Sequence, residues 1–381
     1  MFGFRPGPSD DVPPELEDKE EEVVIEDICP NPLCYHSDVE TEEDLTRFIY
    51  KRDKIESIDD LLELGKLYHC KKNKTYKGLD LKTICKLGEP LTKLNEMVGM
   101  KKVKDDIVNQ IIFFLQGFNK KEKGEMDDEE NGEMLHTIIT GPPGVGKTEL
   151  GKIFGSIYKN MGILSKGTMK IVKRSDLVGK YLGHTAAKTQ KVIDECKGGV
   201  MFIDEAYSLG NKEGRDSFSK ECLDTLNQNL TERRDFLCII AGYKESLDEC
   251  FFNYNEGLKR RFSFRYNIEK YSDEELKEIF LLKVKKEGWD FKNTKKNNKK
   301  LNTFFKDNLK YFPHFGGDIE TLFLNCKIVH SRRVILLPKE DKKLLTIKDV
   351  EAGFKSFLVD RRYKEDEMKN SISPQAMMMY L

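Results

Sequence analysis

The sequence has no apolar run long enough to cross a bilayer, and its amino terminus lacks a basic segment followed by an apolar one. We therefore expect a soluble, intracellular protein, most simply a cytoplasmic one, without a membrane partner. At 381 residues the chain has room for two or three domains and a sizeable core.

An excess of charge of either sign is also missing. The chain has 65 basic and 66 acidic residues, for a net charge of −1. This balance argues against a protein dominated by general nucleic-acid electrostatics, although a local patch remains open. The lysine-rich segments 70–77 and 295–300 are the candidates, and a solvated charged face explains them more simply.

A regular cysteine framework is absent as well. The nine cysteines are odd in number and irregular in spacing, which favours reduced thiols over disulfides. Cys29, Cys34 and His36 suggest a zinc site, but their spacing matches no common zinc motif. Unremarkable thiols are the simpler interpretation, and metal binding there stays an alternative.

Composition and periodicity divide the chain into segments. In order, we expect a disordered acidic tail (1–27), a mostly helical region of unknown role (28–88), an α/β nucleotide-binding domain (89–270) with a mobile charged insert (120–133), a helical domain (271–370) and a tail (371–381).

Five apolar stretches alternate with helical patterns in the α/β segment, at 135–140, 169–172, 200–203, 236–241 and 264–268. This rhythm predicts a parallel sheet covered by helices on both faces. After Ser272, a candidate helix cap, the pattern is helical throughout, with candidate helices at 273–287, 299–311, 318–330 and 347–358.

The most informative motif is a complete G-x-x-x-x-G-K-T phosphate-binding loop between an apolar strand and a helix. Its glycines let consecutive N–H groups point at one anion, and the helix adds its positive end. Lys147 is expected to reach the β- and γ-phosphates, and the Thr148 hydroxyl to bind Mg²⁺. A Gly/Pro turn before an ordinary helix is the alternative. The expected nucleotide-binding residues here are Gly141, Pro142, Pro143, Gly144, Val145, Gly146, Lys147, Thr148 and Glu149.

A second motif supports the first. The apolar run 200–203 ends in Asp204 and Glu205, and ligands of parallel sheets collect at the carboxyl ends of strands. Asp204 is expected to hold the magnesium ion through water, and Glu205 to act as the general base on the attacking water. A solvated Asp-Glu turn is the alternative. Together the two motifs predict a protein that binds a nucleoside triphosphate with Mg²⁺.

Over about residues 90–360 the sequence resembles the AAA+ ATPases, in the branch of the red-type rubisco activase CbbX and stage V sporulation protein K. The blocks that carry the resemblance are 176–185, 198–207, 240–243 and 257–262. It implies a P-loop α/β domain followed by a small all-helical lid. It also implies assembly into a ring, expected to be a hexamer, with ATP bound between subunits.

The resemblance also implies roles for single residues. Val98 and Gly99 are expected to line the adenine pocket. Arg261 is expected to reach a neighbouring subunit's γ-phosphate, where a guanidinium stabilises spread negative charge. Tyr181 and Leu182 are expected in a pore loop that grips an extended polypeptide. A solvated basic corner at Arg261 and a packed tyrosine at Tyr181 are the alternatives.

The chain departs from the family pattern at two places. The fourth strand ends in Ala241-Gly242-Tyr243, where the family often has a polar residue that orients water, and Tyr243 is the nearest candidate. The lid segment 315–320 has no arginine where many members carry one that senses nucleotide. This second departure puts the coupling of the lid, and the hydrolysis rate, in doubt.

We therefore expect an ATP hydrolase that remodels or threads a protein client, whose identity the sequence does not reveal. One alternative is a nucleic-acid-stimulated motor or loader, since related folds perform that work. Another is an ATP-dependent assembly switch with little turnover, which the missing lid arginine favours.

Overall fold

The computed structural model describes residues 53–70, 74–118, 135–181, 183–210, 216–253, 256–292, 294–336, 338 and 342–371, with only the backbone described at 256 and 360–371. The expectations for the acidic tail, the charged insert, residues 372–381, Leu182, and the Cys29, Cys34 and His36 group all concern residues outside these ranges.

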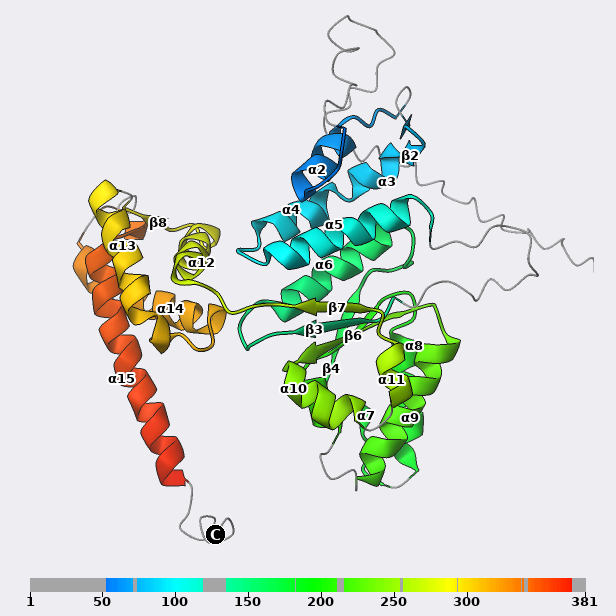
Figure 1. Ribbon diagram of the computed structural model, residues 1–381. Coiled ribbons are helices and arrows are strands. Elements are labelled where there is room, and N and C mark those ends of the chain that lie inside the picture. Colours follow the sequence, from blue (N-terminus) through cyan, green and yellow to red (C-terminus); the bar gives the residue numbers. More distant parts are fainter. Residues whose placement is uncertain are drawn as a thin grey trace, which may run out of the picture.

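A five-stranded parallel sheet forms the centre of the larger part of the molecule (Figure 1). Its order is β4-β5-β6-β3-β7, and every neighbouring pair is parallel. This confirms the predicted parallel α/β fold, and each strand lies where an apolar stretch was found. The strands are β3 (Thr137–Thr140), β4 (Met169–Val172), β5 (Val200–Ile203), β6 (Leu237–Gly242) and β7 (Phe264–Asn267).

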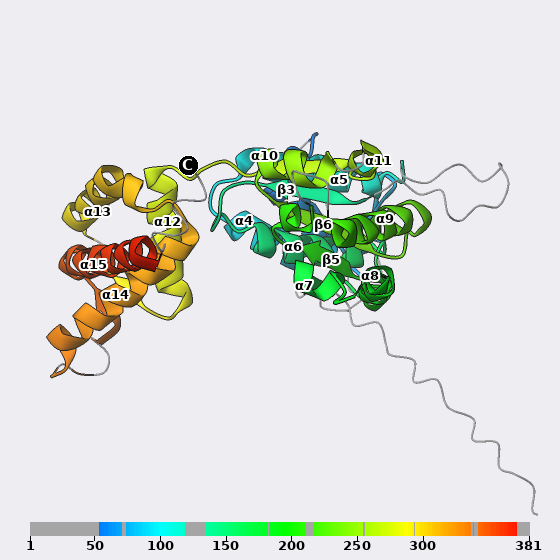
Figure 2. The same cartoon turned by 90° about the horizontal axis from the view of Figure 1, so that it is seen from below.

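The two faces of the sheet belong to different hydrophobic clusters, because successive side chains of a strand point to opposite sides. In β6, Ile239 packs in the cluster that contains α5 (Lys101–Leu115) and α6 (Lys147–Asn160). Its neighbour Ile240 packs in the cluster that contains the second layer of helices. That layer, on the other side of the sheet in Figures 1 and 2, includes α7 (Arg174–Leu177), α8 (His184–Glu195), α9 (Ser217–Glu232), α10 (Lys244–Ser246) and α11 (Glu256–Arg260).

The described part of the amino-terminal region packs against α5 and α6 rather than standing apart. Leu61 and Leu87 are fully buried and belong to the same cluster as the α5 side chains. Ser57 and Asp60 form a capping box that starts the first of its helices. The elements of this region are α2 (Ile58–Lys66), β1 (Thr75–Tyr76), β2 (Leu79–Asp80), α3 (Leu81–Lys86) and α4 (Gly88–Glu96).

Four helices form the lid, which lies beside the sheet domain in both views. They are α12 (Asp273–Lys286), α13 (Lys295–Asn308), α14 (Gly316–Val334) and α15 (Ile347–Ser371). The lid also holds a short parallel pair, β8 (Asp290–Phe291) with β9 (Leu344–Leu345), which the sequence did not predict. Two residues are too few to show the alternating pattern of a strand.

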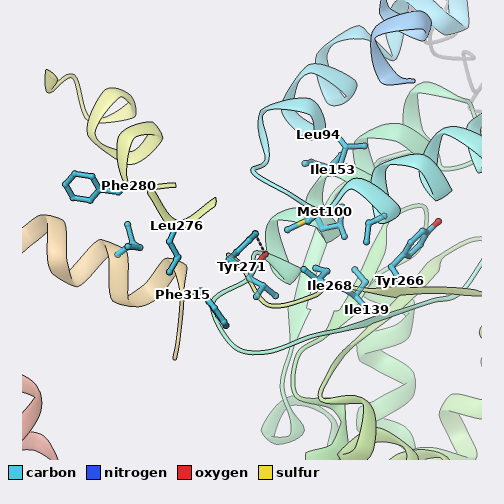
Figure 3. Packing of buried hydrophobic residues seen from close by; sticks show 14 of the residues in the cluster. Leu94, Met100, Ile139, Ile153, Tyr266, Ile268, Tyr271, Leu276, Phe280 and Phe315 are labelled. Atoms are coloured by element: carbon cyan, nitrogen blue, oxygen red, sulfur yellow. Dashed lines mark hydrogen bonds between the residues drawn. The ribbon is translucent and has the colours of Figure 1, made fainter. Parts of the chain in front are cut away.

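One hydrophobic cluster continues from the sheet domain into the lid (Figure 3). Tyr271, between β7 and α12, lies at the junction: its hydroxyl donates to the Val145 carbonyl over 2.9 Å. Its ring meets the Phe315 ring edge-on, with centroids 5.8 Å apart. The lid is therefore anchored directly at the phosphate-binding loop.

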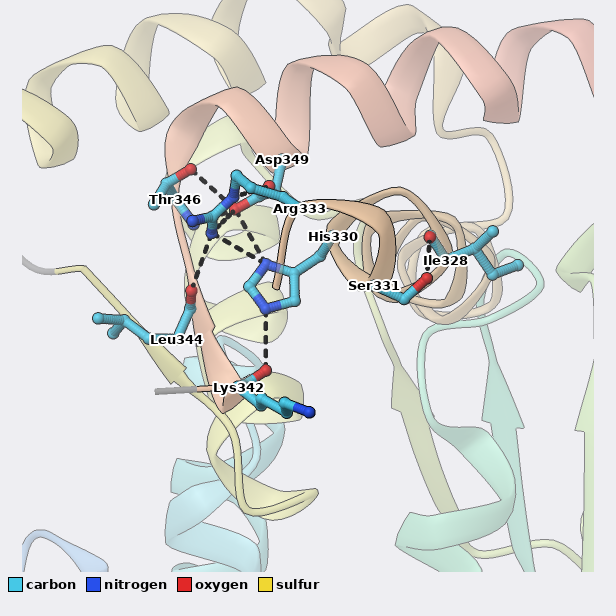
Figure 4. Close-up of polar contacts among 8 residues, drawn as sticks. All are labelled: Ile328, His330, Ser331, Arg333, Lys342, Leu344, Thr346 and Asp349. Atoms are coloured by element: carbon cyan, nitrogen blue, oxygen red, sulfur yellow. Dashed lines mark hydrogen bonds and ion pairs between the residues drawn. The ribbon is translucent and has the colours of Figure 1, made fainter. Parts of the chain in front are cut away.

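A buried polar network joins α14 to α15 inside the lid (Figure 4). Asp349, only 4% exposed, accepts hydrogen bonds from the Arg333 guanidinium (2.9 and 3.1 Å) and from Thr346 (2.8 Å), and lies 3.2 Å from His330 Nδ1. Burial alone would raise the pKa of Asp349, but the bonds from Arg333 and Thr346 lower it. The carboxylate is therefore charged at neutral pH and holds the two helices together.

We expect Asp349→Ala to destabilise the lid by about 2 kcal/mol, because it removes the buried carboxylate that accepts from Arg333 and Thr346 and that faces the buried His330 ring. Trp289, the single tryptophan, packs against His330 with ring centroids 5.5 Å apart, so its fluorescence reports on this region during urea unfolding. Glu351→Gln, an exposed change on the same helix, should stay within about 0.5 kcal/mol of the unsubstituted chain. Equal midpoints for Asp349→Ala and the unsubstituted chain would contradict the expectation.

Candidate nucleotide-binding site

The loop between β3 and α6 has a backbone that only glycine adopts readily. Gly141, Gly144 and Gly146 have φ of 154°, 74° and 91°. A Cβ at Gly144 would lie 1.8 Å from the His314 carbonyl oxygen, and the Gly144 carbonyl accepts a hydrogen bond from Gly316 N–H over 3.0 Å. The loop is thus shaped both for an anion and for close approach of the lid.

Lys147 lies at the first turn of α6, with its ammonium folded over the loop. Nζ donates to the carbonyls of Gly141 (3.0 Å) and Pro142 (2.8 Å), and lies 5.9 Å from the centre of the Tyr243 ring. Burial lowers the pKa of Lys147, while the charges of Asp204 and Glu205 act in the opposite direction. The cation is therefore held within electrostatic reach of both carboxylates.

The two carboxylates follow β5 directly. Glu205 has φ of 50°, a left-handed conformation that is rare for residues other than glycine, and its N–H donates to Asp204 Oδ1 over 3.0 Å. Such strain costs on the order of 1–3 kcal/mol and clusters at functional sites. Here it accompanies a turn that leaves both side chains lining the same cleft as Lys147.

This cleft has a volume of about 470 Å³, within the range of small-molecule sites. Its walls come from three sources: the phosphate loop, the carboxyl ends of the strands and the lid. The lining residues are Pro143, Gly144, Gly146, Lys147, Thr148 and Glu149; Asp204, Glu205, Tyr207, Gly242 and Tyr243; and Ile279, Lys283, Gly316, Gly317, Ile319 and Glu320.

A second cleft of about 530 Å³ shares Gly144 and Gly146 with the first and has more apolar walls. Val98, expected at the adenine, is among its lining residues. Gly99 is not: its Cα faces Glu275, whose Oε1 would lie 2.3 Å from an added Cβ. The sequence therefore placed Val98 beside the loop, while Gly99 forms the tight turn that leads into α5.

The residues expected to bind magnesium fit that ion chemically. The Thr148 hydroxyl and the Asp204 carboxylate line the cleft together, and both are hard oxygen donors. Across the described ranges there is no cluster of three His, Cys, Asp or Glu side chains that could hold a metal without other ligands. Mg²⁺ keeps several waters and binds through few protein groups plus phosphate oxygens, so two oxygen donors are enough on the protein side.

Tyr207 is a site residue that the sequence analysis did not single out. Burial raises its pKa, and the charge of Glu205 and a hydrogen bond to that carboxylate raise it further. Its ring centroid lies 6.0 Å from that of Tyr243, so two aromatic rings border Glu205 and Lys147. The available signal was its position one turn after the Asp-Glu pair, inside the block 198–207.

Arg261 and Tyr181 lie away from the cleft. Arg261 precedes the amino end of β7, whereas the cleft lies at the carboxyl ends of the strands. The buried Nε of Arg261 has no hydrogen-bond acceptor in the described part of the chain. Tyr181 is 68% exposed in the loop before α8, where its ring contacts His184. Neither residue lines this cleft.

The comparisons with known proteins agree with this geometry. Residues 137–269 match the model of the ATPase family associated with various cellular activities (AAA). A putative cfxQ-like protein of Acanthamoeba polyphaga mimivirus is 45% identical over 309 residues, covering 80% of this chain and 73% of the relative. A CfxQ homolog of Galdieria sulphuraria is 31% identical over 269 residues, covering 70% of this chain and 85% of the relative.

Of two further matches, one covers a smaller share of the chain and the other has a lower sequence identity. Stage V sporulation protein K of Bacillus subtilis is 37% identical over 188 residues, covering 49% of this chain and 57% of the relative. The FIGL-1 AAA domain solved in complex with ADP is 18% identical, with a TM-score of 0.48 over 71% of this chain and 89% of that one.

Within the ranges that the structure describes, none of the helices combines the length and the apolar character that a bilayer crossing requires. The phosphate loop, the Asp-Glu pair and the helical lid line one cleft, and the matches to the two CfxQ-like relatives span most of the chain. The chain therefore belongs to the AAA family of ATPases, in the branch of the CfxQ-like proteins and stage V sporulation protein K.

Proposed function

We propose that this chain binds ATP with Mg²⁺ in the cleft between sheet and lid and hydrolyses it to ADP and phosphate. The observation that carries the proposal is that Lys147, Asp204 and Glu205 line one cleft at the carboxyl ends of parallel strands. A cation and two carboxylates in this arrangement match the needs of phosphoryl transfer to water.

Each group has a defined task in this proposal. Lys147 exchanges its bonds to the loop carbonyls for bonds to the β- and γ-phosphates. Thr148 and Asp204 would hold Mg²⁺, and the ion would neutralise charge on the phosphate oxygens. Glu205 accepts a proton from the attacking water, and Tyr207 orients the Glu205 carboxylate.

We also propose that Arg261 completes the site of a neighbouring subunit in a ring, most simply a hexamer. Its place at the amino end of β7 supports this, because the cleft of the same chain lies at the opposite end of the strands. A guanidinium brought by a neighbour makes hydrolysis depend on assembly.

The client of the ring is proposed to be a protein segment gripped by the loop that carries Tyr181. A polar link supports mechanical coupling between this loop and the site. Arg174, at the start of α7, donates to the Ser208 carbonyl (2.9 Å) and pairs with Asp216 (2.5 Å). Movement of the segment after Glu205 is thereby passed to the helix that leads to Tyr181.

The alternatives are distinguished by simple measurements. The lysines of segment 295–300 lie exposed at the start of α13, as a solvated face would. Stimulation of ATPase activity by DNA or RNA, rather than by unfolded polypeptide, would favour the nucleic-acid motor. A rate per subunit that stays near zero at every protein concentration would favour the assembly switch.

We expect Glu205→Gln to bind ATP normally and to hydrolyse it about 10²–10⁴-fold more slowly, because an amide cannot accept the proton. Phosphate release and fluorescent-nucleotide binding measure the two effects separately. Glu232→Gln, an exposed change on α9, is the control that should leave both unchanged. Full turnover by Glu205→Gln would remove this residue from the mechanism.

Arg261→Ala should lower turnover about 10³-fold or more, with nucleotide affinity retained. An equal mixture of Arg261→Ala and Glu205→Gln subunits should recover about a quarter of the wild-type rate. In random rings, about one site in four combines an intact Glu205 with an intact Arg261 from its neighbour. Steady-state ATPase of the mixture measures this. If the mixture stays as inactive as its parts, Arg261 does not act between subunits.

A further inference from the structure

The lid side of the cleft carries a cation that the family pattern does not place there. Segment 315–320 has no arginine, and Arg333, further along α14, is occupied by Asp349. Lys283, on the first lid helix α12, nevertheless lines the cleft together with Lys147, Asp204 and Glu205. Its side chain is 32% exposed.

Two acidic residues hold Lys283. Nζ donates to Glu320 Oε1 over 2.7 Å and lies 3.6 Å from Glu287 Oε1. The hydrogen bond to Glu320 is the main cause that raises the pKa of Lys283, so the amine is charged at neutral pH. Glu320 lines the same cleft, whereas Glu287 also receives Lys327 over 2.7 Å.

We propose that Lys283 turns from Glu320 to the terminal phosphates of bound ATP and so supplies the positive charge of the lid. This inference rests on the proposed function of the cleft. A lysine suits the task, because it is a compact point charge on a flexible stem and a common phosphate ligand.

The exchange of partners costs little. The Glu320 side chain is 64% exposed, and exposed ion pairs contribute only about 0–1 kcal/mol in general. Glu287 remains paired with Lys327 when Lys283 turns toward the phosphates. A triphosphate offers Lys283 several charged oxygens in place of one solvated carboxylate.

Glu320 also has a part in this arrangement. Its carboxylate holds Lys283 while the cleft is empty of phosphate, and it opposes any anion that binds without engaging the lysine. The pair therefore favours ATP over ADP, since the γ-phosphate is the group that competes with Glu320 for the ammonium.

The test is a double-mutant cycle read by equilibrium binding of fluorescent ATP and ADP analogues. We expect Lys283→Met to weaken ATP binding about tenfold and ADP binding about twofold or less, the loss of one charge-assisted bond. Glu320→Gln should strengthen ATP binding, and the double variant should bind ATP about tenfold more weakly than Glu320→Gln, since Lys283 then contributes only through the phosphate. Lys285→Met, which removes the same charge from an exposed position of α12, should change neither affinity.

Two results would overturn the inference while leaving the proposed function intact. The first is equal ATP affinity of the double variant and Glu320→Gln, since Lys283 would then only neutralise Glu320. The second is equal weakening of ATP and ADP by Lys283→Met. A wild-type chain that bound neither nucleotide would overturn the proposed function, and this inference with it. Unchanged urea midpoints, followed by Trp289 fluorescence, exclude misfolding of the variants.

Discussion

The parallel register of β3, β5 and β6 is the constraint on which the rest of the structure depends. Thr140 at the end of β3 pairs with Gly242 at the end of β6, and Ile203 at the end of β5 pairs with Ile240. The loop after β3, the carboxylates after β5 and Tyr243 after β6 therefore open onto one edge of the sheet. Without this register the three motifs would be separate turns with no shared chemistry.

Backbone strain surrounds the same edge. Of the four non-glycine residues with positive φ in the described ranges, Glu205 lines the first cleft, Phe315 directly precedes Gly316 of both clefts, and Met100 lies two residues after Val98 of the second. Each costs on the order of 1–3 kcal/mol, which only a well-packed surrounding can offset. Met100 and Phe315 are themselves members of the main hydrophobic cluster, so the core that holds the fold also holds these strained positions.

The sequence predicted what depends on local pattern. The strands, the phosphate loop and the Asp-Glu pair are each short, contiguous signals, and the parallel sheet follows from their order. The β8–β9 pair was not predicted because a strand of two residues shows no alternating hydrophobic pattern. The positions of Lys283 and Tyr207 in the cleft were not predicted, because they depend on how α12 and the turn after β5 pack against distant residues. Gly99 lies outside the lining of the second cleft, and its place at the adenine stays a prediction.

The carbonyls of two consecutive residues of the phosphate loop accept hydrogen bonds from the lid side of the molecule. The Gly144 carbonyl accepts from Gly316, and the Val145 carbonyl accepts from the Tyr271 hydroxyl. An anion bound by the N–H of either peptide polarises it and makes its carbonyl a better acceptor. An anion in the loop and docking of the lid would thus reinforce one another through the amide dipoles, and a movement of the lid would change the affinity of the loop for the anion.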